Sequence, residues 1–460
     1  MRPPEFLRSD DLPPMSRLSF VWEQRYFLLW GCVTGAVEGN IAAIVAKKTF
    51  EAPDALASFI WGLPITMNLV NLVWGAWLRG RRIVPTLRLL TLCAAVCVAS
   101  IALTPRTWGV VGALIFAAQL ALTHFLFSGL LTVRVAIWRA NYPPSHRARI
   151  TGRIQTLRFL IVLAGGAIVS TLFDVNPDSY RLIYIAVAAL GLSSVIVAGR
   201  LRIRGEARAL AHQRESETPR GGPRGIVASL REAGAILRGD RAFARYMAAQ
   251  FLLGSANFFT DGVLVTELSG RMEFGYYFTN LFMLQIPTVL MLVAIRPWSQ
   301  YIDRRGVVRF RVVSTALWLA SYACVCAAML LAQYGAAAWL WAALALLAAG
   351  RIINGVCRGG GSLAWSLGHL HFARPEQAEI YMGIHVGLTG LRGLLMPNIG
   401  AAVNALAGNA SFAIPVALAA IALWMFRRID HDTRTGLITP QGDAFRGRLV
   451  RPEQLPGSPT

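Results

Sequence analysis

The sequence predicts an all-α polytopic membrane protein with twelve transmembrane helices, and three observations lead to this fold class. Of the 460 residues, 55% are hydrophobic and only 15% are charged, whereas a soluble domain usually contains about 25% charged residues. The mean hydropathy is +0.49. The apolar residues gather into long runs, and such runs cross a bilayer as helices because lipid offers no partner for unpaired backbone groups.

Twelve apolar runs follow one another along the chain in two sets of six. The runs are 17 to 29 residues long, and a membrane-spanning helix needs roughly 20 residues. The first six runs cover residues 26–46, 56–78, 86–103, 108–136, 154–173 and 182–198. The second six cover residues 246–268, 274–295, 312–332, 336–356, 381–403 and 410–426. A polar segment precedes the first run, so we expect a retained transmembrane helix there and not a cleaved signal peptide.

These runs divide the chain into five segments. We expect a cytoplasmic N-terminal segment, an N-terminal six-helix bundle, a basic cytoplasmic linker, a C-terminal six-helix bundle and a disordered cytoplasmic tail. Their boundaries, in that order, are 1–25, 26–198, 199–245, 246–426 and 427–460. After a stretch rich in Arg, Gly and Pro, the linker resumes a helical period with Ile226, Leu230, Ala233 and Leu237 on one face. This predicts an amphipathic helix at the inner membrane surface.

The charge distribution indicates a membrane partner. A net charge of +21 is large enough for a nucleic-acid-binding protein. However, the predicted outward loops hold only five of the 45 basic residues, namely Lys47, Lys48, Arg106, Arg181 and Arg271. This is the positive-inside asymmetry, and it places both termini in the cytoplasm. We therefore expect a multi-pass protein of the bacterial inner membrane, with the lipid bilayer and not nucleic acid as its partner.

The two halves of the sequence share features at a shift of about 224 residues. The features that coincide are Asp261 with Glu38, Arg358 with Arg134, and the basic turn 301–306 with 77–82. Internal repeats of this kind are common in secondary transporters, where the substrate site lies at the repeat interface near the membrane midplane. The repeat predicts two bundles of similar fold.

Two stretches of the chain resemble motifs of a known family. The turn SQYIDRRGVVRF (299–310), with Asp303, Arg304 and Gly306, resembles the motif G-x-x-x-D-R-x-G-x-R of the major facilitator superfamily. The resemblance implies that these three residues belong to a conformational latch between the bundles on the inner side. The stretch RIINGVCRGGG (351–361) resembles the family motif R-x-x-x-G, which is usually found on the fourth span and is linked to proton coupling.

The resemblance covers nearly the whole chain, from about residue 25 to residue 428. It implies two pseudo-symmetric six-helix bundles. It also implies that the first, fourth, seventh and tenth spans line a central cavity.

Glu38 lies within the first apolar run, in the stretch GAVEGN. A charged carboxylate in the middle of a transmembrane helix costs about 2.5–3.5 kcal/mol. Such a group can take and release a proton as a cavity alternates between the two sides of the membrane. The alternative is a permanent ion pair with an arginine such as Arg158 or Arg392, which would hold helices together. The sequence leaves both interpretations open.

Further polar side chains within the runs are candidates for substrate binding or proton coupling. They are His124 on the fourth run, Arg158 on the fifth, Asp261 on the seventh, Arg351 and Asn354 on the tenth, and His385 and Arg392 on the eleventh. Each also has a structural interpretation. His124 can be a packing residue, Arg351 can anchor a helix end, and Asn354 can form a hydrogen bond between helices.

Several classes of site are disfavoured by the sequence. There is no GxxxxGK[ST] phosphate loop and no GxSxG elbow. The six cysteines lie in or beside apolar runs, without the spacing of a zinc site or a disulfide framework. His369 and His371, two residues apart, are too sparse to predict a metal site. We expect no metal, no cofactor and no enzymatic activity.

The sequence thus predicts a secondary active transporter that moves a small-molecule or ionic substrate by alternating access and is driven by protons. Glu38 and Asp261 are the candidate proton carriers. The arginines favour an anionic or polar solute and the acids a cation, so the substrate stays open. One alternative is a non-transporting membrane sensor or assembly scaffold. Another is a membrane-embedded enzyme acting on lipid, for which only the inner loop 368–379 offers candidate groups.

Overall fold

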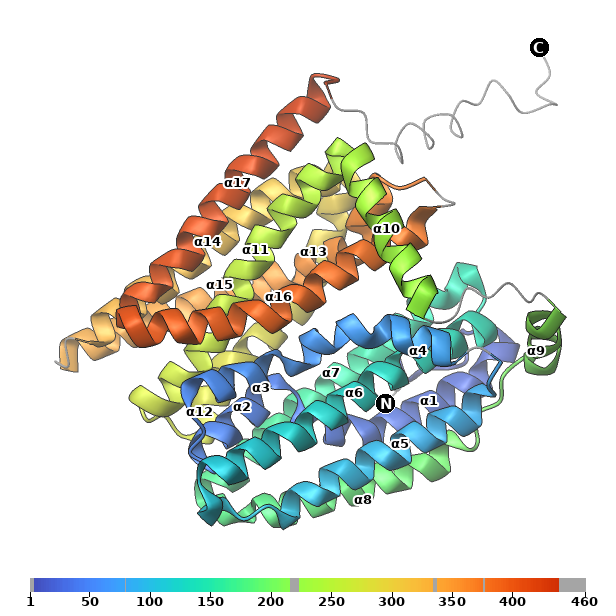
Figure 1. The fold of residues 1–460 in the computed structure, drawn as a ribbon, viewed down its shortest axis with the longest axis horizontal. Helices are drawn as coiled ribbons and strands as arrows, with labels where there is room; N and C mark the ends of the chain where they lie inside the picture. Colours follow the sequence, from blue (N-terminus) through green and yellow to red (C-terminus); the bar gives the residue numbers. More distant parts are fainter. Residues whose placement is uncertain (1–3, 79, 216–222, 334–336, 375–376, 438–460) are drawn as a thin grey trace. The chain divides into compact units, whose positions relative to one another are not determined.

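The computed structural model describes residues 4–78, 80–215, 223–333, 337–374 and 377–437, and every regular element in these ranges is a helix (Figure 1). The expectations for the linker stretch 216–222 and for the tail 438–460 lie outside the described residues.

Eight α-helices form the first half of the chain. They are α1 (Pro14–Val37), α2 (Gly39–Lys48), α3 (Asp54–Thr66), α4 (Asn71–Trp77), α5 (Ile83–Ser100), α6 (Val110–Asn141), α7 (Pro144–Val175) and α8 (Tyr180–Ala198). A short 3₁₀ segment, η2 (Met67–Val70), joins α3 to α4. The first six predicted runs each coincide with one of these helices or with consecutive ones.

The second half begins with two helices of the predicted linker, α9 (Glu206–Glu215) and α10 (Pro223–Gly239). The helices that follow are α11 (Arg241–Thr266), α12 (Tyr276–Asn280), α13 (Ile286–Arg305), α14 (Val307–Ala332), α15 (Ala337–Leu367), α16 (Ala378–Ala407) and α17 (Ala413–Arg434). They coincide with the last six predicted runs. The predicted class, an all-α polytopic membrane protein, is confirmed.

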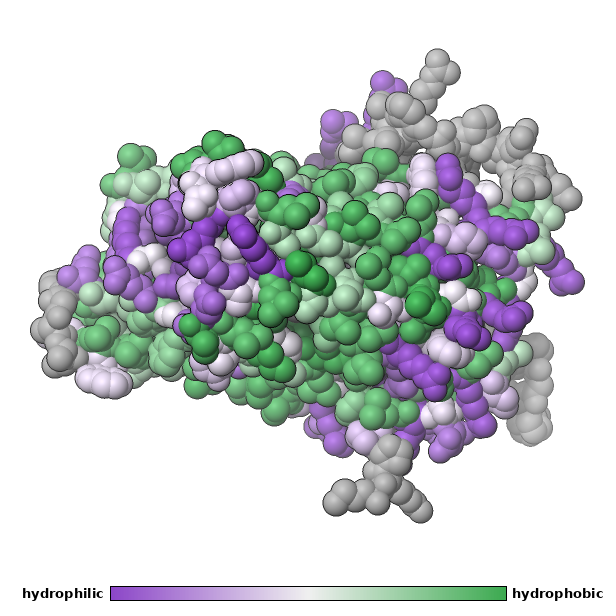
Figure 2. All heavy atoms as spheres, turned by 90° about the horizontal axis from the view of Figure 1, so that it is seen from below, coloured by the Kyte–Doolittle hydropathy of each residue, from purple (hydrophilic) through white to green (hydrophobic). Residues whose placement is uncertain are grey.

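The surface of these helices suits lipid. Eight helical segments in the described residues are long and apolar enough to cross a membrane, and the bent pair α1 and α2 makes a ninth. Large apolar side chains stand exposed on several of them, for example Ile196 at 70%, Val293 at 70% and Trp341 at 74%. Figure 2 shows extended apolar areas on the visible face. Such areas are rare on soluble monomers but are expected where a surface meets acyl chains.

The first span is broken, and here the prediction of one continuous helix over 26–46 is wrong. Glu38 has an extended backbone (φ −79°, ψ 128°) between α1 and α2. Gly39 follows with a φ of +33°, in the left-handed region that favours glycine. The axes of α1 and α2 differ by 41°. The run of apolar residues continues through this point, so hydropathy alone does not reveal the break.

Two predicted boundaries also differ from the observed helix ends. α1 begins at Pro14, within the segment predicted to precede the first span. Proline is favoured at the first helical position because its missing N–H group has no partner there in any helix. At the other end of the chain, α17 continues to Arg434, into the segment predicted as a disordered tail. Apolarity marks the part of a helix that meets lipid, and polar residues extend the helix beyond it.

The chain forms two compact units. Unit 1 contains the described residues up to Gly225 together with the segments Asp261–Gln285 and Gly393–Ala402. These two segments from the second half of the sequence pack closely with first-half helices. The hydroxyl of Ser58 on α3 donates to the Gly262 carbonyl at 2.8 Å. A methyl group at Gly62 would lie only 2.6 Å from the carbonyl oxygen of Gly393, so α3 needs a glycine at this contact.

Unit 2 contains the described parts of Ile226–Thr260, Ile286–Arg392 and Val403–Thr460. Its core includes buried aromatic side chains on α11, α14 and α17 and in the α15–α16 connection, namely Phe243, Tyr246, Phe310, Phe372 and Phe426. The predicted linker helix is present as α10, and Ala233, Ile236 and Leu237 pack against this core. The side chains of Ile226 and Leu230 lie outside the described residues.

Candidate functional site

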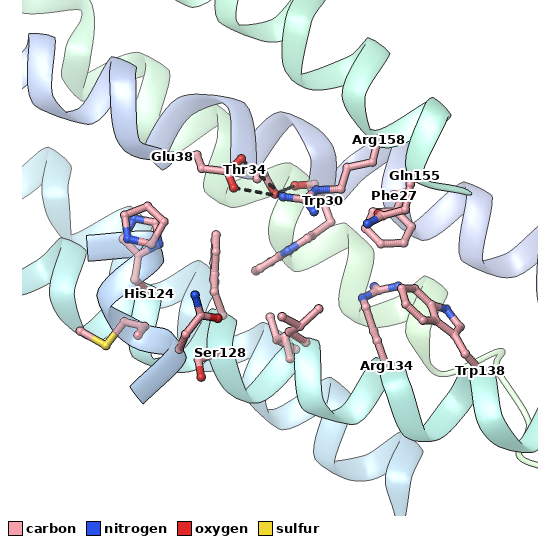
Figure 3. A pocket seen from close by; sticks show the side chains of 16 residues that line it. Phe27, Trp30, Thr34, Glu38, His124, Ser128, Arg134, Trp138, Gln155 and Arg158 are labelled. Atoms are coloured by element: carbon pink, nitrogen blue, oxygen red, sulfur yellow. Dashed lines mark hydrogen bonds and ion pairs between the residues drawn. The ribbon is translucent and has the colours of Figure 1, made fainter. Parts of the chain in front are cut away.

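A pocket in unit 1 forms beside the broken first span. Figure 3 shows side chains of α1, α6 and α7 directed into it. The sixteen lining residues are Phe27, Trp30, Thr34, Glu38, Pro64, Met67, Asn68, His124, Phe127, Ser128, Leu130, Leu131, Arg134, Trp138, Gln155 and Arg158. Half of them are aromatic or aliphatic, and the other half are polar or charged. This composition is typical of sites for small molecules, where the polar groups fix orientation.

Glu38 and Arg158 form an ion pair within this pocket (Figure 3). The Arg158 Nη2 atom donates to Glu38 Oε1 at 3.0 Å and approaches Oε2 at 3.5 Å. Both side chains are partly accessible, at 37% for Glu38 and 24% for Arg158. Of the two arginines expected as partners of Glu38, the structure pairs it with Arg158. A partly exposed pair can open and close at a much lower free-energy cost than a fully buried one.

His124 on α6 supports the break in the first span. The residue is 2% exposed, and its Nε2 atom donates to the Val37 carbonyl oxygen at 3.1 Å. The last carbonyl groups of a helix have no partner within that helix. His124 therefore satisfies the end of α1 directly beside Glu38. It lines the pocket and its hydrogen bond supports the pocket wall, while a role in substrate binding or proton coupling stays a prediction.

A buried carboxylate that the sequence analysis did not select lies at the Arg134 end of the pocket. Glu23 on α1 has no exposed surface. It accepts hydrogen bonds from Trp138 Nε1 at 2.8 Å and Tyr142 Oη at 3.0 Å. The Nη1 atom of Arg134 lies 3.7 Å from its Oε2 atom. Glu23 was assigned to the N-terminal segment because it precedes the apolar run, and only the helical continuity back to Pro14 brings it into the bundle.

Arg134 is held by aromatic rings as well as by Glu23. Its guanidinium lies 4.2 Å from the ring centre of Tyr26 and 3.9 Å from that of Phe27. Contacts at this distance are favourable because the ring face carries negative charge. Both ring contacts and the Glu23 pair orient Arg134 towards the pocket wall. The sequence placed Arg134 in the internal repeat and did not select it as a site residue.

The remaining candidates do not line this pocket. Asp261 on α11 belongs to unit 1 and is 1% exposed. Arg351 and Asn354 are buried on α15 in unit 2. His385 and Arg392 are buried on one face of α16, also in unit 2. The structure therefore brings three predicted site residues together in this pocket, namely Glu38, His124 and Arg158, and the other candidates are not among its lining residues.

The predicted latch residues lie at the turn between α13 and α14. Asp303 and Arg304 are exposed at the end of α13. Gly306 has a φ of 78°, which explains the glycine at this position in the motif. In the part of the chain that the structure describes, no group of three His, Cys, Asp or Glu residues could hold a metal ion. His369 and His371 lie on the short 3₁₀ segment η8 (Gly368–His371).

Comparison with solved structures identifies the same fold in known transporters. A mutant of the nucleoside transporter NupG superposes with a TM-score of 0.66 at 13% identity, covering 89% of this chain and 99% of that one. The xylose transporter XylE from E. coli, in an inward-open conformation, gives 0.62 at 11% identity, covering 89% and 95%. A bacterial homologue of the iron transporter ferroportin gives 0.59 at 12% identity, covering 90% and 98%.

These identities are low enough that the similarity establishes the fold and not the substrate. No curated protein sequence matches the chain significantly. The sequence profile of the Major Facilitator Superfamily, by contrast, matches residues 27–347, well over half of the chain. The fold and this match agree with the resemblance seen in the motifs. The chain belongs to the Major Facilitator Superfamily, a family of membrane transporters.

Proposed function

We propose that this protein is a secondary active transporter that carries a small solute across the membrane by alternating access and couples this movement to protons. The observation that carries the proposal is the Glu38–Arg158 ion pair in the pocket of unit 1, directly at the break in the first span. Broken helices at a binding site are a recurring feature of secondary transporters, because the break supplies a ligand with polar groups that a continuous helix would keep paired.

The ion pair supplies a mechanism for coupling. When Glu38 is ionised, it holds the Arg158 guanidinium. Protonation of Glu38 removes the charge that attracts Arg158, and the guanidinium is then available to a polar or anionic group of the solute. A proton on Glu38 and a solute bound to Arg158 thus favour the same state of the pocket, in which the Glu38–Arg158 ion pair is broken. Each ligand shifts the equilibrium only by its difference in affinity between the two states.

Asp261 and the other buried candidates stay secondary in this proposal. Glu38 is accessible from the pocket, whereas Asp261 is almost fully buried. A proton carrier has to exchange with water on each side of the membrane during the cycle, and an accessible carboxylate does so without local unfolding. The exposed turn with Asp303, Arg304 and Gly306 is proposed as the latch that contributes to switching.

The pocket chemistry favours a solute with both apolar and polar parts. Trp30, Phe127 and Trp138 supply flat apolar surfaces, and Asn68 and Gln155 supply hydrogen-bonding groups. Aromatic walls with a few polar groups bind and orient such molecules. The proposed location is the bacterial inner membrane with both termini in the cytoplasm, on the basis of the positive-inside asymmetry.

A flux measurement tests the proposal. The protein is reconstituted in liposomes, and pools of metabolites, ions and drugs are offered outside while uptake is followed by mass spectrometry. A carrier should show faster uptake when the same solute is present inside the liposomes. The reason is that a carrier with bound solute returns across the membrane faster than an empty carrier does. Arg158→Gln should lower this exchange. If the wild type moves no solute from any pool, the protein is a non-transporting sensor or scaffold, and the proposal is wrong.

A further inference from the structure

We propose that unit 2 contains a binding site for a small oxyanion, a carboxylate or a phosphate, formed by Arg311, His385 and Arg392. None of these residues lines the pocket of unit 1. The proposal concerns binding, and it stands whether or not the bound anion is the solute that the protein carries.

The two arginines come from different helices and bind neighbouring turns of α11. The Nε atom of Arg311, on α14, donates to Tyr246 Oη at 3.2 Å. The Nη1 atom of Arg392, on α16, donates to the backbone carbonyl of Gln250. Tyr246 and Gln250 are one helical turn apart on α11, and residues at this spacing face the same side. The two guanidinium groups are therefore held close to each other against α11.

Helix α16 completes the cluster. His385, Thr389 and Arg392 recur at helical spacing and share a face. The Nη2 atom of Arg392 donates to Thr389 Oγ1 at 2.7 Å, and that hydroxyl donates to the His385 carbonyl at 2.8 Å. The positive charges of Arg392 and Arg311 both act on the His385 ring. Three nitrogen-bearing side chains thus meet in one region.

Gly254 leaves the space that the Arg392 guanidinium occupies. A methyl group at Gly254, one turn beyond Gln250 on α11, would overlap the guanidinium of Arg392. The guanidinium also lies 5.6 Å from the ring centre of Phe251 and 5.7 Å from that of Phe258. The side chain is therefore fixed in one position by its surroundings. Such preorganisation lowers the entropy cost of binding a ligand.

No carboxylate balances these charges in the described part of unit 2. Arg311 and Arg392 are each 2% exposed and His385 is 3% exposed. No ion pair joins either arginine to an acid among the described residues. The ion pairs found there lie elsewhere and include Arg245 with Asp432 and Arg434 with Asp430. Asp240, near the start of α11, is engaged by the Tyr381 hydroxyl at 2.9 Å.

Several polar atoms of the cluster are buried without a hydrogen-bond partner in the described structure. They are Arg311 Nη2, Arg392 Nε, His385 Nε2 and the side-chain oxygen of Gln250. Burying a charge without a counter-charge is energetically costly, so proteins seldom keep one without a use. In the interior of a membrane bundle the cost is higher still. An anion would neutralise the charge and accept hydrogen bonds from the unpartnered nitrogen atoms of the cluster.

The donor set identifies the ligand class. Arginine side chains present pairs of N–H groups whose geometry matches the oxygens of carboxylates and phosphates. A metal cation is excluded by the positive charge of the cluster itself. A free inorganic anion and an acidic group on a larger solute offer the same oxygens, so the test uses small probes of both kinds.

The experiment measures thermal unfolding of the purified full-length protein in detergent while sodium acetate or sodium phosphate is titrated at constant ionic strength. A ligand that binds only the folded state raises Tm in a saturable way. We expect this for at least one of the two probes. Arg311→Met and Arg392→Met should each weaken the apparent affinity by about tenfold or more, because each removes a charge-assisted contact. Arg296→Met, which changes an exposed arginine of α13, is the matched control and should leave the titration unchanged.

Lysine variants keep the test informative if a methionine variant does not fold. Arg311→Lys and Arg392→Lys retain the charge and lose the paired N–H geometry, so binding should weaken but persist. The probe that saturates at the lower concentration distinguishes a carboxylate site from a phosphate site. The proposal is overturned if neither probe gives a saturable rise in Tm for the wild type. It is equally overturned if the Arg311 and Arg392 variants respond as the Arg296 control does.

Discussion

Glu38 is the single residue between α1 and α2, and its carboxylate forms an ion pair with Arg158 in the pocket. The sequence predicted an acidic group within the first span and offered two arginines as partners. It could not choose between Arg158 and Arg392, because that choice depends on which faces of distant helices turn towards each other. The extended backbone at Glu38 was also unpredicted, since a glycine at position 39 is compatible with a continuous helix at modest cost.

The Glu23→Leu substitution tests how much the buried Glu23–Arg134 pair contributes to the free energy of unfolding. Replacing Glu23 by leucine removes the counter-charge of Arg134, whose side chain is only 5% exposed. Breaking a buried pair from one side typically costs roughly 3–5 kcal/mol. We expect Glu23→Leu to lower the free energy of unfolding by about this amount, measured by denaturant unfolding in detergent.

The double variant Glu23→Leu with Arg134→Leu should be less destabilised than the sum of the two single changes, since neither charge is then left alone. Glu232→Leu, at an exposed glutamate of α10, serves as the control and should have little effect. A Glu23→Leu protein as stable as the wild type would show that the buried pair contributes nothing net.

At the scale of elements, the sequence predicted where helices lie better than where they end. All twelve apolar runs coincide with helices. However, α1 begins at Pro14, α7 begins at Pro144 and α17 ends at Arg434, each beyond its predicted run. Hydropathy reports contact with lipid, whereas backbone hydrogen bonding continues through polar residues until a cap or a turn. Glu23 was missed for this reason, because it lies on the polar extension of a transmembrane helix.

The polar extension of α7 also holds the N-terminal segment. Arg153 donates to the Asp11 carboxylate at 2.8 and 2.7 Å. Arg149 contacts the same group. The hydrogen bonds from Arg153, supported by the nearby positive charges, lower the pKa of Asp11 from 3.8 to about 2. The contact therefore stabilises the folded state at any pH above 3.8, and its contribution is lost as the pH falls from there towards about 2.

The comparison of wild type with Asp11→Asn measures this effect. The wild type should have the higher Tm near neutral pH, and the difference should shrink as the pH is lowered through 4 towards the pKa of about 2. Asp10→Asn, at the exposed neighbouring position, should show no such trend. A Tm difference that stays constant over this pH range would mean that the charge of Asp11 does not stabilise the segment.

For the whole molecule, composition and hydropathy predicted an all-helical membrane protein, and the family was recognisable from two short motifs. The internal repeat suggested two bundles divided near the linker. The compact units differ from this division, since Asp261–Gln285 and Gly393–Ala402 belong to unit 1. Contacts such as Ser58 with Gly262 arise from the close approach of small residues, and no periodicity in the sequence encodes their partners.

If Glu38 carries the coupled proton, replacing its carboxyl group should abolish solute-dependent changes of internal pH in proteoliposomes. A pH gradient is imposed, pools of solutes are added, and wild type, Glu38→Gln and the exposed control Glu232→Gln are compared. We predict that one pool dissipates the gradient through the wild type and the control but not through Glu38→Gln, while exchange of the labelled solute persists in all three. Solute-dependent proton movement through Glu38→Gln at the wild-type rate would show that Glu38 is not the proton carrier.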